Sequence, residues 1–243
     1  MRRLILAALC ALVLPSAAAA QASIRVQATG NNGTSAAVSG TLTGVQTGDL
    51  LTVQCRERDG VSISSVADTV NGAWTLAVTR AATAARALIY YFPNAASGSP
   101  VVTVTFGGTN QPSDCVFVAW AGIATTTPLD TTSSGGNSSA TSHSPGAITP
   151  SASVLVLTAV AVGADHGGAT APSGFTLLTP DAGATSNRQA YAYKVGHTGG
   201  VTASTTTTNA VNSDAVVAAF LESGGGGGGG TARTLTLLGV GAP

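Results

Sequence analysis

The chain has 243 residues, of which only 8% are charged, and its ten basic and ten acidic side chains cancel to a formal net charge of zero. Typical globular domains carry about a quarter of their residues as charges. Phosphate backbones are bound through clustered Lys and Arg, so the absence of a basic field argues against nucleic acid as a partner.

The N-terminus has the three parts of a secretory leader. Two arginines near the start precede an apolar run over residues 4–14, and small residues fill 16–22. This pattern predicts a signal peptide over residues 1–22, cleaved near Ala20 or Ala22. The protein is therefore expected to be exported to the periplasm, the cell surface or the medium.

Membrane attachment after cleavage is not expected. The leader's apolar run is short, and no later segment reaches the roughly eighteen apolar residues of a membrane helix. A lipid anchor at Cys10 is an alternative to plain cleavage, although Leu9 is bulky where such a processing site needs a small residue.

Short runs of Val, Leu, Thr, Ala and aromatic residues, bounded by Gly, Asn, Asp and Pro, predict strands throughout the mature chain. They lie at 23–29, 36–43, 49–58, 62–67, 73–79, 86–92, 100–106, 114–121, 152–163, 174–179, 187–195, 201–207 and 213–221. The Ser-, Thr- and Gly-rich segment 124–150 is expected to be a mobile loop. Residues 224–243 are expected to be a Gly-rich flexible tail, with a docking strand at 231–243 as the alternative.

An internal repeat appears when residues 49–123 are laid over residues 151–223. Residues 113–120 match 213–220 position by position. We therefore predict an all-β domain over 23–223, a jelly-roll-like two-sheet sandwich built from an internal duplication of a four-strand unit, with one core shared by both halves. The alternative is two tandem immunoglobulin-like domains joined by a linker at 124–150.

Two cysteines remain after leader cleavage, Cys55 and Cys115, and both lie in predicted strands. An oxidising compartment favours a disulfide, which would close a loop of about sixty residues and contribute about 4 kcal/mol. Two buried free thiols are the alternative.

Motifs for catalysis are missing from the sequence. His143, His166 and His197 fall in predicted loops and are interpreted as solvated, with no metal-ligand spacing around them. No Gly-x-Ser-x-Gly elbow accompanies the serines. The aspartates beside Gly, Ser and Thr are interpreted as turn formers: Asp59, Asp68, Asp130, Asp165 and Asp181. We expect no enzyme activity, metal or cofactor, with a hydrolase of unrecognised site as the lesser hypothesis.

Aromatic residues are the remaining candidates for binding. Trp74 and Trp120 are replaced by phenylalanines in the second copy, which favours core packing for both. Strand alternation places Tyr90 and Phe92 on one face, and Lys194 takes the place of Phe92 in the second copy. Because lysine is rarely buried, this face is predicted to be exposed to solvent, and Tyr90 and Phe92 are the candidate ligand-binding residues. The alternative is that the long loop covers them.

Five segments together resemble a loosely defined group of β-sandwich modules in secreted bacterial and phage-associated proteins. These segments are 48–51, 71–74, 91–98, 101–106 and 118–122. The resemblance covers about residues 45–125 and recurs more weakly over 150–222. It implies a binding or structural role at a cell surface or on a virion, although Ala119 stands where the pattern leads us to expect an acidic residue.

The sequence therefore predicts an exported, non-enzymatic binding module for a glycan or protein partner. The alternative is a structural or assembly protein of a cell surface or virion.

Overall fold

The computed structural model describes residues 20–224, apart from 32–34, 59–61, 84, 109–112 and 179–187. Within these residues the regular structure consists of nineteen strands and no helix, which confirms the all-β prediction. Most of the expected signal peptide (1–22) and of the expected Gly-rich tail (224–243) lies outside the described residues. The described part contains no helix that could cross a membrane.

The first half of the chain forms two antiparallel sheets. The inner sheet has the order β1-β9-β3-β7-β6 and the outer sheet β2-β8-β4-β5. The strands of the inner sheet are β1 (Ser23–Asn31), β9 (Asp114–Ala121), β3 (Leu50–Arg58), β7 (Ala85–Phe92) and β6 (Thr75–Arg80). Those of the outer sheet are β2 (Ala37–Thr41), β8 (Val101–Phe106), β4 (Ile63–Asp68) and β5 (Gly72–Ala73). The chain crosses between the sheets in the order of a jelly roll and stays within one sheet only from β4 to β5 and from β6 to β7.

The second half repeats this arrangement. Its inner sheet has the order β10-β19-β13-β16-β15, and its outer layer consists of the pairings β11-β18-β14 and β12-β17. The inner strands are β10 (Leu129–Gly135), β19 (Ser213–Leu221), β13 (Val154–Val162), β16 (Gln189–His197) and β15 (Thr176–Leu178). The outer strands are β11 (Ala140–His143), β18 (Thr205–Val211), β14 (Ala169–Thr170), β12 (Ala147–Ile148) and β17 (Val201–Thr202).

The internal duplication predicted from the sequence is therefore present, but the repeated unit is larger than the four strands expected. Each half contains a jelly roll of its own, spanning residues 23–121 and 129–221. Segment 124–150, expected to be a loop, contains β10, β11 and β12, so that expectation is wrong. The segment lacks an apolar run because β10 is a half-exposed edge strand, held by backbone pairing to β19.

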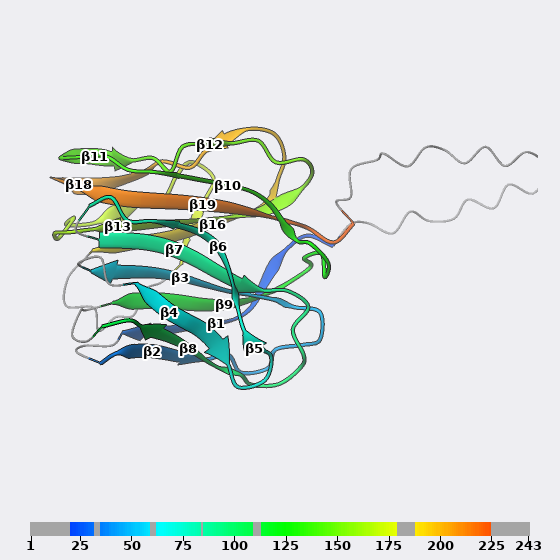
Figure 1. The fold of residues 1–243 in the computed structure, drawn as a ribbon. Helices are drawn as coiled ribbons and strands as arrows, with labels where there is room; N and C mark the ends of the chain where they lie inside the picture. Colours follow the sequence, from blue (N-terminus) through cyan, green and yellow to red (C-terminus); the bar gives the residue numbers. More distant parts are fainter. Residues whose placement is uncertain are drawn as a thin grey trace, which may run out of the picture.

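The four sheet layers stack with the two inner sheets face to face (Figure 1). Between them lies an interface core to which both halves contribute, including Trp120, Leu157 and Phe220. Two aromatic pairs cross this interface, with ring centroids 5.3 Å apart for Tyr91 and Phe220 and 5.1 Å apart for Trp120 and Tyr193. All nine residues of β13 are buried, as its apolar faces predicted, because it packs against a layer on each side.

Each half also has its own core between its inner and outer sheets. The first half has one continuous cluster, which includes Trp74, Phe117 and Val104. In the second half the cluster is divided in two, around Val156 and around Val160. The molecule therefore has separate cores as well as a shared one, whereas the sequence predicted only the shared one.

Buried polar contacts fix the two halves against each other. Asp214, which is fully buried, accepts hydrogen bonds from Arg80 Nε at 2.9 Å and from the backbone amides of Ala82 and Thr83 at 3.0 and 2.9 Å. The hydroxyl of Tyr191 donates to the carbonyl of Asp114 at 2.6 Å. Burial is the main cause that raises the pKa of Tyr191 well above its usual value, so this hydroxyl stays a donor.

A disulfide joins Cys55 and Cys115, which lie directly opposite each other on β3 and β9. Both cysteines are buried in the first-half core. The second half has Val160 opposite Ala215 at the matching position. The disulfide expected from the sequence is therefore confirmed, and the alternative of two free thiols does not apply.

Candidate functional site

The residues predicted to bind a ligand lie at an edge of the first inner sheet. Tyr90 and Phe92 are in β7, and Tyr90 is directly opposite Leu76 of the edge strand β6. Arg86 lies on the same face of β7 by strand alternation. We call these four residues, Leu76, Arg86, Tyr90 and Phe92, the β6–β7 surface.

The β6–β7 surface lies on the face of the inner sheet against which the outer sheet packs. The outer sheet has four strands and the inner sheet five, and Leu76 on β6 is 41% exposed. By contrast, Leu88 on the same face of β7 is only 1% exposed. The surface therefore marks where the cover ends.

Tyr90 and Phe92 share one face, as predicted, but both rings are half-buried and pack against the first-half core. They are less open than the exposed strip expected from the sequence. Desolvation raises the pKa of Tyr90, and the nearby Arg86 charge acts in the opposite direction. Tyr90 therefore presents a protonated hydroxyl, with one side of its ring held by the core.

The second half does not repeat this surface. Register places Leu177 where the first half has Leu76, Ala192 in place of Tyr90, and Lys194 in place of Phe92. Leu177 is 40% exposed, and the Lys194 ammonium lies 5.8 Å from the centre of the Phe175 ring, within cation–π range. The aromatic pair is therefore a property of the first half alone.

Sequence reasoning missed two members of the surface. Arg86 could have been added by extending the alternation from Tyr90 and Leu88. Leu76 could not, because which residue of β6 faces Tyr90 depends on a register shift between Leu76 and Val78.

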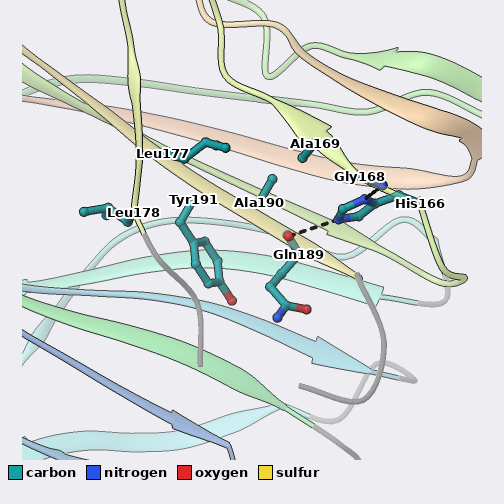
Figure 2. A pocket seen from close by; sticks show the side chains of 8 residues that line it. All are labelled: His166, Gly168, Ala169, Leu177, Leu178, Gln189, Ala190 and Tyr191. Carbon is teal, nitrogen blue, oxygen red and sulfur yellow. Dashed lines mark hydrogen bonds between the residues drawn. The ribbon is translucent and has the colours of Figure 1, made fainter. Parts of the chain in front are cut away.

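A small hollow of about 150 Å³ opens on the second half (Figure 2). Its lining includes His166, Ala169, Leu177 and Ala190. Ala190 takes the register position that the larger Leu88 has in the first half, which leaves space there. Figure 2 shows Gln189 and Tyr191 pointing together, away from Ala169 and Leu177.

His166 beside this hollow is buried rather than solvated, which corrects the expectation from the sequence. The amide of Gly168 donates to His166 Nδ1 at 3.1 Å, so Nε2 carries the proton and donates to the carbonyl of Gln189, also at 3.1 Å (Figure 2). Both ring nitrogens thus have backbone partners, and the ring holds the loop before β14 against β16.

His143 is also buried, in β11, where the sequence predicted a solvated loop residue. Thr207 Oγ1 donates its proton to the carbonyl of Asn209, so it accepts from His143 Nε2 at 2.9 Å. Nδ1 then accepts from Ser213 Oγ at 2.8 Å. Burial is the first cause that lowers the pKa of His143, and His166 is the second.

Although His143 and Ser213 form a hydrogen-bonded pair, they do not form a hydrolase site. Ser213 is fully buried, and the second ring nitrogen of His143 is bound to Thr207 instead of a carboxylate. An activated serine needs access to substrate and an orienting partner behind the histidine. The two side chains therefore lie in the core with their polar atoms hydrogen-bonded to each other and to Thr207.

The third histidine, His197, lies at the end of β16 and is partly exposed.

Among the described aspartates, Asp68 accepts hydrogen bonds from the amides of Val70 and Asn71, and Asp165 accepts one from the amide of Gly167, which confirms their roles in turns. Asp130 instead binds the amide and hydroxyl of Ser151, and Asp59 and Asp181 lie outside the described residues. No cluster of three or more His, Cys, Asp or Glu suited to a metal occurs in the described part of the chain.

Neither a scan against protein-family models nor searches of curated proteins and of solved structures found a match to this chain.

Proposed function

We propose that the protein is an exported, non-enzymatic binding module that contacts a glycan or protein partner through the β6–β7 surface. The observation that carries this proposal is the half-exposed pair Tyr90 and Phe92, with the open side chain of Leu76 beside it at an uncovered sheet edge. Tyr and Arg are the residue types that dominate binding energy at interfaces.

The geometry suits recognition because the rings are already held in place. Each ring packs on the core with one side, so little conformational entropy remains to be lost when a ligand covers the other side. The Tyr90 hydroxyl adds a hydrogen-bond donor next to the apolar contact, and Arg86, which is ion-paired with Glu57 at 3.6 Å, adds a positive charge beside it.

Export is supported by the leader pattern and by the buried disulfide, which is typical of proteins in oxidising compartments. The sequence's resemblance to modules of secreted bacterial and phage-associated proteins supports the same location.

A glycan array, followed by titration calorimetry with the best binder, tests the proposal. Tyr90→Ala and Leu76→Ala should each weaken binding at least about fivefold, because truncating a central contact costs more than about 1 kcal/mol. Leu177→Ala is the matched control, since it removes an equally exposed leucine at the equivalent place in the second half. Unchanged affinity in Tyr90→Ala and Leu76→Ala would remove the assignment.

The second candidate is a structural or assembly protein, favoured by the outer face of the first half. Its outward positions carry only short neutral side chains: Ala37, Ser39, Thr41, Ser65, Ala67, Val101, Thr103 and Thr105. The one charged residue in these strands, Asp68, points inward and accepts a hydrogen bond from Trp74 Nε1 at 2.7 Å. Without charges on its outward positions, this face presents no electrostatic barrier to a second copy.

Light scattering over a range of concentrations tests this candidate. An assembly through the outer face should dissociate in Thr103→Glu, which places a charge at the centre of the face. A monomer at all concentrations in the parent chain would exclude it.

A further inference from the structure

Residues Gln21 and Ala22 lie in the predicted leader, yet the structure makes them part of the folded domain. Ala22 is only 4% exposed and belongs to the interface core. Its amide donates to Glu222 Oε1 at 3.0 Å, which joins the start of the domain to the end of β19.

Glu222 is buried, and the Ala22 amide is one of its hydrogen-bond donors. Its carboxylate also accepts from the amide of Gly196 at 2.8 Å and from Ser153 Oγ at 2.7 Å. No cation lies within ion-pair distance of it among the residues that the structure describes. A buried carboxylate is stabilised by such donors and by any positive charge nearby.

Gln21 is seated between two glycines, one from each half. A Cβ on Gly122 would lie 2.6 Å from the Gln21 carbonyl oxygen, and one on Gly196 would lie 2.6 Å from Gln21 Nε2. Both glycines also have a positive φ, of +79° and +62°. The backbones of Gly122 and Gly196 thus approach Gln21 so closely that a side chain at either glycine would overlap Gln21.

Leader cleavage needs small residues just before the cut, and the sequence offers this after both Ala20 and Ala22. We infer that the leader is removed at the Ala20–Gln21 peptide bond, so that the mature chain begins at Gln21. This inference rests on the export part of the proposed function. The step is a hydrolysis by a leader peptidase, in which water adds across the bond to leave a carboxylate on Ala20 and an ammonium group on Gln21.

The alternative cut after Ala22 would take away structure that the fold uses. It would empty the space filled by Ala22 in the interface core and remove one of the donors to Glu222. The cut after Ala20 keeps both. It also places a new ammonium group within about 7 Å of the Glu222 carboxylate, because successive residues are about 3.8 Å apart and the Ala22 amide is 3.0 Å away.

Intact-mass measurement and N-terminal sequencing of the full chain, exported by a bacterial host, test the inference. The expected product begins at Gln21. A mass lower than that of the Gln21 chain by one ammonia also supports it when the N-terminal peptide carries the loss, because an N-terminal glutamine cyclises to pyroglutamate and releases ammonia. A chain that begins at Ser23 overturns the inference but leaves export intact, whereas a chain that retains residues 1–20 overturns both.

The structural reason can be tested separately with purified chains released from a cleavable tag. The chain that begins at Ser23 should melt several degrees below the chain that begins at Gln21. In a Glu222→Gln background, where the carboxylate is gone, the difference between the two chains should shrink. Equal melting temperatures of the Gln21 and Ser23 chains would overturn the argument for the cleavage position.

Discussion

Asp214 offers the sharpest test of how the two halves hold together. Its carboxylate is fully buried in the second half, and it accepts four hydrogen bonds from the first: from Arg80 Nε, from the amides of Ala82 and Thr83, and from the Thr83 hydroxyl. Asp214→Ala leaves two backbone amides without their acceptor, and each such loss costs about 1–3 kcal/mol. The Arg80 side chain is 32% exposed, so its ion pair adds only a screened contribution.

We therefore expect Asp214→Ala to lower the free energy of unfolding by about 3 kcal/mol. Urea denaturation followed by tryptophan fluorescence measures this, and the midpoint should fall by about 1–1.5 M for a slope of 2–3 kcal/mol per M. Asp130→Ala is the control, because Asp130 accepts two hydrogen bonds from Ser151 at an exposed site within the second half and makes no contact between the halves in them. A loss in Asp214→Ala no larger than in this control would refute the reasoning.

Three further changes test other parts of the structure. Because the pKa of His143 is lowered in the folded state, the folded state binds fewer protons than the unfolded state below about pH 6.5. The free energy of unfolding should therefore fall as the pH drops from there. His143→Asn should reduce this fall, which urea titrations at pH 7.5 and 5 measure. Replacing Cys55 by Val together with Cys115 by Ala, the pair present in the second half, should cost about 2–4 kcal/mol. Gly40→Ala should cost about 1–3 kcal/mol, because its Cβ would overlap the Phe117 ring.

Each of these predictions has a result that contradicts it. An unchanged pH slope in His143→Asn would mean that another group titrates. A double cysteine variant as stable as the parent would mean that the disulfide adds nothing. Gly200→Ala is the control for Gly40→Ala, since its nearest neighbours lie 3.8 Å away, and equal losses in the two would contradict the steric argument.

The strands with strong apolar patterning could be placed from the sequence alone. The observed β3, β9 and β19 differ from their predicted ranges by at most one residue at each end. Those strands lie in inner sheets, where burial on both faces demands continuous Val, Leu, Ala and aromatic runs. The edge strand β10 and the outer strands β11 and β12 could not be predicted, because none of them has a continuous apolar run and each pairs with a strand distant in sequence.

The number of cores could not be predicted for a related reason. The repeat indicates that both halves have the same strands. It does not indicate that both faces of a strand are buried when one face carries small side chains such as Ala and Thr. The buried histidines were misjudged in the same way, since His143 takes a core position whose partners, Thr207 and Ser213, are more than sixty residues away. In the first half the corresponding strand pair places Val38 beside Val104.

The prediction for Tyr90 and Phe92 succeeded in assigning the face and overestimated the exposure. Alternation along β7 fixes which residues share a side, because the side-chain period of a strand is two. How much of each ring remains open depends on the width of the outer sheet, which only the three-dimensional structure shows.

Two jelly rolls, each with its own core, are joined by one buried interface, and we expect them to unfold as a single cooperative unit. Differential scanning calorimetry of the disulfide-bonded chain tests this most directly. We expect one transition whose calorimetric and van't Hoff enthalpies agree. Two resolved transitions, each carrying about half of the total enthalpy, would show that the halves unfold independently and would contradict it.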